Sequence, residues 1–132
     1  MMWLAFLALM LADVRAIDAD TLRARGETYR LAGVDAPETA RARCPGERAL
    51  AWAAQARAQA LLDAAAAISA SPAFNPAGRR VWPRDRYGRR LAHILVDGRD
   101  LGATLIAEGH AVAWTPGGQH DWCAESARRT MP

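Results

Sequence analysis

The stretch VRAIDADTLRARGETYRLAGV, residues 14–34, decides the fold that we expect for this chain. It contains three short runs in which apolar and polar residues alternate, at 14–17, 21–25 and 28–34. Alternation of this kind is typical of β-strands that bury one face. Turn residues separate the runs, and the pair at 26–27 marks a tight hairpin. The stretch therefore predicts three consecutive strands.

A long helix is predicted next, over residues 47–67, because apolar residues recur there at helical spacing. The apolar face of this helix is thin, since most of its members are alanines. We therefore expect it to lie on the outside of a sheet. Residues 68–84 contain three of the seven prolines of the chain and read as loop-like, so no strand can be placed within them.

The last part of the chain returns to a strand pattern at residues 90–96, followed by a turn at 97–98. Asp100 is a cap for a short helix that ends at Gly109, and a final strand is expected over residues 111–114. This order of elements is compatible with a five-stranded barrel of the oligonucleotide-binding (OB) type with flanking helices.

Three polar clusters follow one another along the chain: IDADT at 17–21, YRLAGVDAPE at 29–38 and DRYGR at 85–89. Each has an ordinary structural explanation, as a solvated turn, as the start of a helix, and as a turn with a surface arginine. Together they supply carboxylates for a hard metal ion, a further carboxylate for a water molecule, and arginines for a phosphate. All three clusters in this order are much harder to obtain by chance than any one of them alone.

On these clusters the sequence resembles the thermonuclease family, the staphylococcal-nuclease-like domain, from about residue 14 to residue 114. The resemblance implies an α+β, mainly β, fold: a five-stranded OB-fold barrel with two or three flanking helices. It also implies a calcium-dependent nuclease that hydrolyses phosphodiester bonds of DNA or RNA.

The resemblance also implies roles for individual residues. Asp20 and Asp35 resemble the family's calcium carboxylates, and the backbone carbonyl of Ala36 is a further ligand. Glu38 matches the glutamate that handles the attacking water, and Arg30 matches one of two catalytic arginines.

The other residues with an expected role lie later in the chain. Arg89 matches the second catalytic arginine, and Tyr87 matches the tyrosine beside the bound nucleotide. Asp85, which opens the same cluster, belongs to this substrate-binding group. Trp114 joins it as a candidate for stacking on a base, because it follows the last strand.

The chemistry of these residue types supports the same roles independently. Guanidinium groups are planar, remain protonated, and donate two hydrogen bonds to a phosphate at once. Oxygen ligands suit calcium or magnesium, and the softer ligands that select zinc are absent from the cluster. We expect Glu38 to serve as the base and not as a metal ligand.

Length and charge limit the class of protein. A chain of 132 residues has room for one core, so we expect a single nuclease-like domain over residues 13–132, acting as a monomer. All 17 basic residues are arginines, and the net charge of +3 favours a polyanionic partner modestly. Residues 1–12 are apolar, and they are either an export segment or the start of the first strand. They are too short for a stable membrane span.

Cys44 and Cys123 are the only cysteines. They are either two reduced thiols or one disulfide that ties the start of the long helix to the tail. A disulfide would indicate an oxidising compartment, so the localisation leans towards an exported protein, with a cytoplasmic one as the alternative. Two other functions stay open: a non-catalytic nucleic-acid-binding OB-fold module, and a small exported structural domain.

Overall fold

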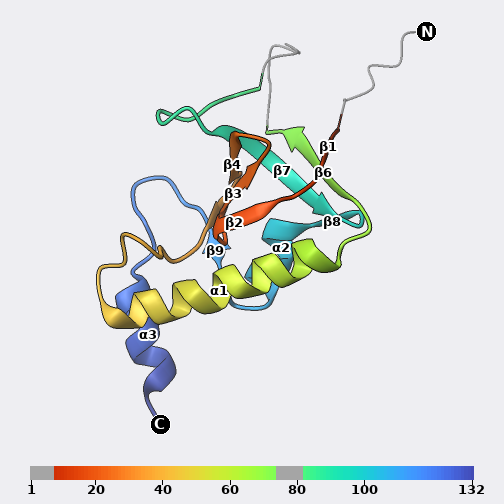
Figure 1. The fold of residues 1–132 in the computed structure, drawn as a ribbon. Coiled ribbons are helices and arrows are strands. Elements are labelled where there is room, and N and C mark those ends of the chain that lie inside the picture. The colour runs from red at the N-terminus through yellow and green to blue at the C-terminus, as the bar shows by residue number, and fades with distance from the viewer. Residues whose placement is uncertain (1–7, 74–81) are drawn as a thin grey trace, which may run out of the picture.

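The computed structural model describes residues 8–73 and 82–132. Most of the apolar segment 1–12 lies outside the described residues, and so does the middle of the stretch 68–84. Within the described part, strands form a strongly curled sheet, the first two helices lie against it, and the third helix packs on the first (Figure 1).

The curled sheet has the strand order β1-β6-β7-β4-β3-β2. Its strands are β1 (Leu9–Leu11), β2 (Arg15–Asp18), β3 (Thr21–Ala24), β4 (Glu27–Leu31), β6 (Ile68–Pro72) and β7 (Arg90–Val96). All neighbours are antiparallel except β4 and β7, which run parallel. Because β1 and β2 follow one another in the chain yet lie at opposite ends of the order, the sheet bends round towards a barrel.

Three short strands complete the β structure. β8 (Arg99–Asp100) pairs with β7. β5 (Val34–Asp35) and β9 (Val112–Ala113) form a separate antiparallel pair, which brings the second polar cluster beside the last part of the chain.

Two of the β-hairpins turn through two residues with positive φ. Arg25 (φ 49°) and Gly26 (φ 80°) join β3 to β4, while Asp97 (φ 50°) and Gly98 (φ 82°) join β7 to β8. Two positive φ values are what a tight hairpin between twisted strands requires. The second turn lies where the sequence predicts it, and the first lies one residue earlier than predicted.

The helices are α1 (Pro45–Ala64), α2 (Leu101–Ala107) and α3 (Trp122–Thr130). The prediction of residues 47–67 for α1 was two residues late at its start, because Cys44 is the N-cap and Pro45 occupies the first turn. It was three residues late at its end, because Asp97 accepts hydrogen bonds from the backbone N–H groups of Ala66 and Ala67 and holds them outside the helix.

The other two helices begin at aspartate caps. Asp100 accepts from the backbone N–H of Ala103 at 2.8 Å, as the sequence predicts for α2. Asp121 caps α3 in the same way through Ala124, and this helix was not predicted.

β6 is the strand that the sequence could not place. Its five residues, ISASP, carry little hydrophobic alternation, but Ala70 is fully buried between β1 and β7. Small residues give a weak strand signal in the sequence. β6 is stabilised instead by backbone pairing with a strand on each side.

The core lies inside the curl of the sheet. Its largest members are Leu22, Tyr29, Ile94, Leu101 and Leu105. From outside the curl α1 contributes only a narrow buried stripe, consisting of Ala51, Ala54, Ala58 and Leu62. This arrangement confirms the expected α+β, mainly β, OB-fold-like class with three flanking helices. No helix among the described residues has the length and apolar character needed to cross a membrane.

Candidate functional site

Asp20, in the turn between β2 and β3, is the centre of the first and second polar clusters. Its side chain is buried, and Oδ2 accepts a hydrogen bond from the backbone N–H of Ala36 at 2.8 Å. The same oxygen lies 3.4 Å from Nη2 of Arg30. Burial raises the pKa of Asp20, and the nearby charge of Arg30 opposes that rise.

Arg30 projects from β4 towards Asp20, and the backbone fixes its direction. Nη1 donates to the carbonyl oxygens of Leu31 at 2.9 Å and Val34 at 2.7 Å, which face one another across the turn between β4 and β5. Gly33 gives that turn its positive φ of 73°. The guanidinium is therefore set beside the acidic cluster before any ligand binds.

Asp18, the first aspartate of the DAD sequence, is a site residue that the sequence reasoning missed. Its Oδ1 accepts from both the backbone N–H of Thr39 at 2.8 Å and the hydroxyl of Thr39 at 2.7 Å. These bonds draw the segment after Glu38 onto the end of β2. The alternation of Asp18 and Asp20 across one residue was the available signal.

Glu38 lies against Asp18, and its carboxyl group is electrostatically crowded. Burial, followed by the charge of Asp18 and a hydrogen bond with it, raises the pKa of Glu38 to about 7, while the charge of Arg30 opposes the shift. The charge of Asp20 adds to the rise. Glu38 is therefore poised to exchange a proton near neutral pH.

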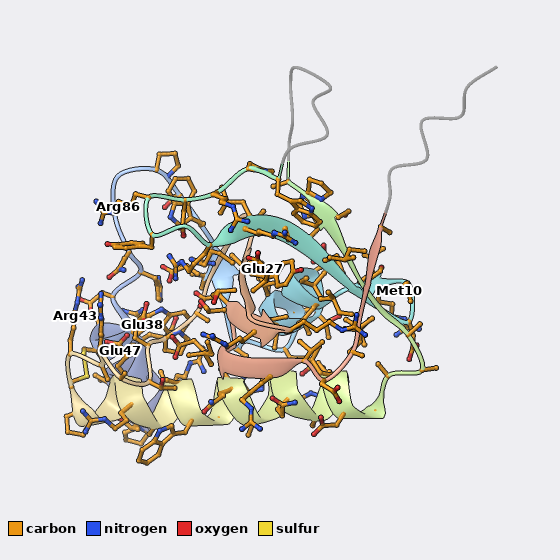
Figure 2. The ribbon with its side chains drawn as sticks, turned by 45° about the horizontal axis from the view of Figure 1, so that its top comes forward. Met10, Glu27, Glu38, Arg43, Glu47 and Arg86 are labelled. Atoms are coloured by element: carbon orange, nitrogen blue, oxygen red, sulfur yellow. A yellow bond between two sulfur atoms is a disulfide. The ribbon has the colours of Figure 1, made fainter. Side chains whose placement is uncertain are left out.

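Glu47 holds the loop that carries Glu38. From the first turn of α1, its buried carboxylate accepts from the backbone N–H of Glu38 at 3.1 Å and of Arg43 at 2.9 Å. Glu38, Arg43 and Glu47 lie together at the N-terminal end of α1 (Figure 2). Sequence reasoning gave Glu47 no role beyond the start of the helix.

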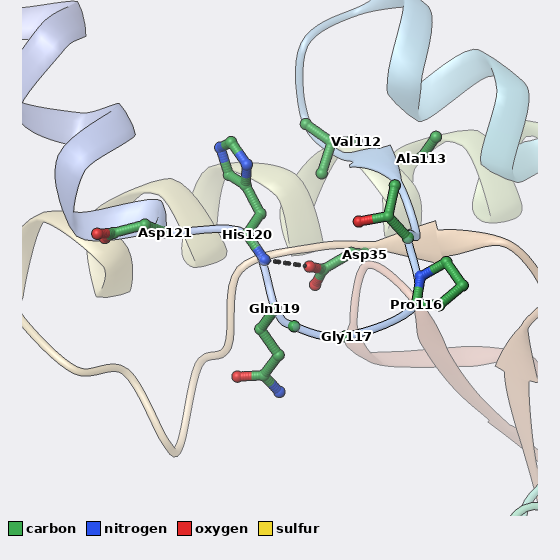
Figure 3. Close-up of a pocket in the computed structure, with 10 residues that line it drawn as sticks. Asp35, Val112, Ala113, Pro116, Gly117, Gln119, His120 and Asp121 are labelled. Carbon is green, nitrogen blue, oxygen red and sulfur yellow. Dashed lines mark hydrogen bonds between the residues drawn. The ribbon is translucent and has the colours of Figure 1, made fainter.

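Asp35 takes a different partner from Asp20. Its Oδ2 accepts a hydrogen bond from the backbone N–H of His120 at 2.8 Å (Figure 3). The carboxylate lines an open pocket of about 510 Å³ formed with residues 112–113 and 115–121. The pocket adjoins the acidic cluster through Asp35 and does not contain Asp20, Arg30 or Glu38.

The donor atoms of the first two clusters have the chemistry of a site for a hard cation. The side chains of Asp18, Asp20, Asp35 and Glu38 offer only oxygen. Burial, with neighbouring carboxylates adding to it, raises the pKa of Asp20 and of Glu38, and the charge of Arg30 opposes both shifts. Across the Ala36 hydrogen bond, Asp20 lies next to the backbone of Asp35. Within residues 8–73 and 82–132, however, no group of three or more His, Cys, Asp or Glu side chains is arranged to hold a metal.

The third polar cluster forms a compact turn before β7. Asp85 accepts from the backbone N–H groups of Tyr87 and Arg89, and its Oδ2 lies 2.6 Å from Nε of Arg89. Burial opposes ionisation of Asp85, but these bonds from Arg89 and Tyr87 hold its pKa below the ordinary value. The ring of Tyr87 is exposed, with the guanidinium carbons of Arg86 and Arg89 at 4.8 and 5.2 Å from its centre.

The fold brings this turn to the strand that carries Arg30. Arg89 directly precedes Arg90, which is the register partner of Tyr29 in the parallel pair of β4 and β7. Among the described residues, Arg89 makes its ion pair with Asp85 and none with the acidic cluster around Asp20.

Trp114 begins the loop after β9 and is 52% exposed. Its backbone N–H donates to the carbonyl of Gly33 at 2.9 Å, which fixes the start of the loop beside the turn that holds Arg30.

Cys44 and Cys123 form a disulfide, with Cα atoms 6.1 Å apart. It joins the N-cap of α1 to the first turn of α3.

A family model described as staphylococcal nuclease homologue matches residues 28–128. The match includes Arg30, Asp35, Glu38 and Arg89, and begins after Asp20. A search of curated proteins finds no match to the chain.

Proposed function

Because the chain belongs to the staphylococcal nuclease homologue family, a nuclease or nucleic-acid-binding type of domain, we propose that it is a calcium-dependent nuclease. It hydrolyses phosphodiester bonds of DNA or RNA by attack of water, acting as a monomer through one domain at residues 13–132. One observation carries this proposal: the guanidinium of Arg30, which can donate to phosphate, lies 3.4 Å from the buried carboxylate of Asp20, and the charges of both groups act on the carboxyl group of Glu38, the base.

Arg30 and Arg89 bind the scissile phosphate. As water attacks, negative charge grows on the phosphate oxygens, and guanidinium groups stabilise it with hydrogen bonds that do not depend on pH. Two carbonyl oxygens already hold the side chain of Arg30, so binding of a phosphate costs little conformational entropy in ordering that side chain. Arg89 is held by Asp85 and would contact phosphate from the neighbouring turn.

Glu38 takes the proton from the attacking water. A base acts best when its pKa lies near the working pH, and the value of about 7 meets that condition. Asp18, which lies against Glu38, is one source of this pKa and so tunes the base.

Calcium would be held by the carboxylates of Asp20 and Asp35 and the carbonyl of Ala36, and when bound it would orient the phosphate and offset the charge of the cluster. Nucleotides on either side of the cleaved bond would pack against Tyr87 and Trp114, with Asp85 fixing the turn that presents Tyr87. Contacts to phosphate and to ring faces are independent of base identity, so we expect weak sequence specificity.

A nucleic-acid-binding module that does not cleave is the second candidate. It is favoured by the separate orientation of Asp35, which bonds to His120, together with the exposed ring of Tyr87 between two arginines. Such a surface would bind a single strand whether or not the carboxylates assembled around a metal.

Cleavage of labelled single-stranded DNA and RNA, with calcium or with a chelator, separates the two candidates. We expect calcium-dependent cleavage by the wild type and a loss of about 10²-fold or more in Glu38→Gln and in Arg89→Ala. Arg57→Ala is the matched control, because it removes an exposed arginine that pairs with Glu108. Binding of DNA without cleavage at any divalent ion would favour the second candidate, and equal cleavage by all variants would refute the assigned roles.

A further inference from the structure

Two carboxylate residues of the candidate site depend on backbone or side-chain groups supplied by distant helices. The backbone N–H of Glu38 donates to Glu47, in the first turn of α1. The carboxylate of Asp35 accepts from the backbone N–H of His120, two residues before α3. The relative position of the two helix starts therefore sets the relative position of Glu38 and Asp35.

The Cys44–Cys123 disulfide joins those two helix starts. Cys44 lies three residues before Glu47, whose backbone N–H donates to Sγ of Cys44 at 3.3 Å. Cys123 lies three residues after His120. The disulfide therefore links the two segments that position Glu38 and Asp35, namely the start of α1 and the start of α3.

The other ties at this junction are weaker. Nη2 of Arg43 donates to Gln119 at 2.8 Å, but both side chains are exposed, so water competes for this bond. Nε2 of His120 lies 3.1 Å from Oε1 of Glu125, which belongs to α3, so this contact does not join α3 to α1. The only buried residue of α3 is Trp122, and beyond it α3 contacts α1 where Ser126 lies against Gly46. The disulfide is the covalent tie between the two helix starts, and the Arg43–Gln119 hydrogen bond beside it is exposed to water.

We propose that the Cys44–Cys123 disulfide positions Asp35 relative to Glu38, so that its reduction switches the site off. The inference rests on the proposed nuclease function for the importance of the two carboxylates. The redox step is ordinary exchange with a dithiol: two electrons and two protons convert the Sγ–Sγ bond to two thiols, while the dithiol closes to its own disulfide. On reduction α3 and the loop 115–121 loosen, and the His120 bond to Asp35 is lost first.

Amide NMR of the whole chain tests the positioning without substrate or metal. Oxidised wild type is compared with dithiol-treated wild type and with Cys44→Ser/Cys123→Ser, where serine retains a side-chain acceptor at the cap of α1. We expect the His120 amide order parameter to fall from about 0.85 to below about 0.6, and its proton shift to move towards the random-coil value. Amides of β3 and β4 keep their shifts. An unchanged His120 amide in a reduced, folded protein overturns the proposal.

A second pair of variants covers the case in which the reduced protein unfolds. Asp121→Ala and Asp100→Ala each remove one aspartate cap, of α3 and α2 respectively, with the disulfide intact. We expect the His120 amide to keep its order in both variants, because the disulfide still joins the starts of α1 and α3. Loss of order at His120 in Asp121→Ala, with the disulfide intact, would show that the helix cap and not the disulfide positions this amide, and would overturn the proposal.

Calcium-dependent cleavage by the oxidised and reduced forms then tests the switch. We expect reduction to lower kcat at least about tenfold, with activity regained on reoxidation. If the oxidised protein neither binds calcium nor cleaves DNA, the proposed nuclease function fails, while the NMR result still decides whether the disulfide positions Asp35. Full activity in the reduced, folded protein contradicts the switch.

Discussion

At the scale of single residues, carboxylates of the site repel one another, and a bound cation or a proton would reduce this repulsion. The carboxyl groups of Asp18, Asp20 and Glu38 lie close enough to act on one another, and Arg30 pairs with Asp20. Burial and like charge raise the pKa values of Glu38 and Asp20, and such shifts are common where a protein binds ions or transfers protons.

The raised pKa of Glu38 predicts how stability changes with pH. Unfolded, Glu38 loses its proton near 4.5, but in the folded protein it keeps the proton up to about 7. Between these values the folded state binds more protons, so the free energy of unfolding falls as pH rises. Asp20 contributes in the same direction.

Denaturation in urea from pH 4.5 to 8, with a chelator present, measures this slope. We expect the decline to level off above pH 7 and to be flatter in Glu38→Gln, which cannot ionise. A steeper decline in Glu38→Gln than in wild type would show that another group is responsible.

Arg30 should not tolerate replacement by lysine. Its guanidinium bonds to the carbonyls of Leu31 and Val34 and approaches Asp20, and one ammonium group cannot reach all three in this planar arrangement. We expect Arg30→Lys to lower the free energy of unfolding by about 1–3 kcal/mol, because buried acceptors lose their donor. Arg23→Lys, at an exposed position on β3, is the control and should change stability by no more than about 0.5 kcal/mol.

At the scale of elements, α1 and α3 approach closely at Gly46. A Cβ atom at this position would lie 2.8 Å from Cβ of Ser126, which real side chains do not allow. Glycine in α1 is therefore required by the neighbouring helix and not by the conformation of its own backbone.

Gly46→Ala tests this contact. In a helix, alanine normally stabilises relative to glycine by about 1 kcal/mol, but here we expect a lower melting temperature, because α3 must move. In a Ser126→Gly background the clash is absent, and the same substitution should be neutral or stabilising. A double-mutant cycle by thermal denaturation measures the coupling, and additive effects would contradict the close approach.

Asp97 connects two further elements. Its carboxylate accepts from the backbone N–H groups of Ala66 at 3.2 Å and Ala67 at 2.9 Å, which ties the connection between α1 and β6 to the turn after β7. Asp97 also has φ 50°, which alanine adopts poorly.

We expect Asp97→Ala to lower the free energy of unfolding by about 1–3 kcal/mol, through lost hydrogen bonds and the unfavourable φ. Asp97→Asn retains an acceptor oxygen and tolerates this φ, so it should lose less. Urea denaturation of both variants gives the comparison. An equal loss would show that charge matters more than the hydrogen bonds.

At the scale of the whole molecule, one covalent bond closes most of the chain. The disulfide joins residues 79 positions apart and encloses α1, β6, β7, β8, α2 and β9. A closed loop of this length removes conformational freedom from the unfolded chain.

Chain entropy predicts that the disulfide contributes about 4–5 kcal/mol to the free energy of unfolding. Denaturation of oxidised wild type and of Cys44→Ser/Cys123→Ser in guanidinium chloride measures the difference. A loss below about 1 kcal/mol would show that the unfolded chain is already restricted without it.

The sequence by itself determined the features that depend on neighbouring residues. The two-residue turn at Asp97 and Gly98, the cap at Asp100 and the helical spacing of α1 follow from local backbone preferences and the periodicity of apolar residues. The three polar clusters were also visible, and their order led to the family that the match at residues 28–128 confirms.

Tertiary structure alone decided the features that depend on distant partners. β6 is a strand because β1 and β7 pair with it, and α3 lies where Cys123 and Trp122 hold it. No local pattern linked Glu38 to Glu47, or Asp35 to the backbone N–H of His120. The physical reason is that the donor in each of these hydrogen bonds is a backbone N–H, which every residue type except proline has, so only the folded chain shows which N–H each carboxylate meets.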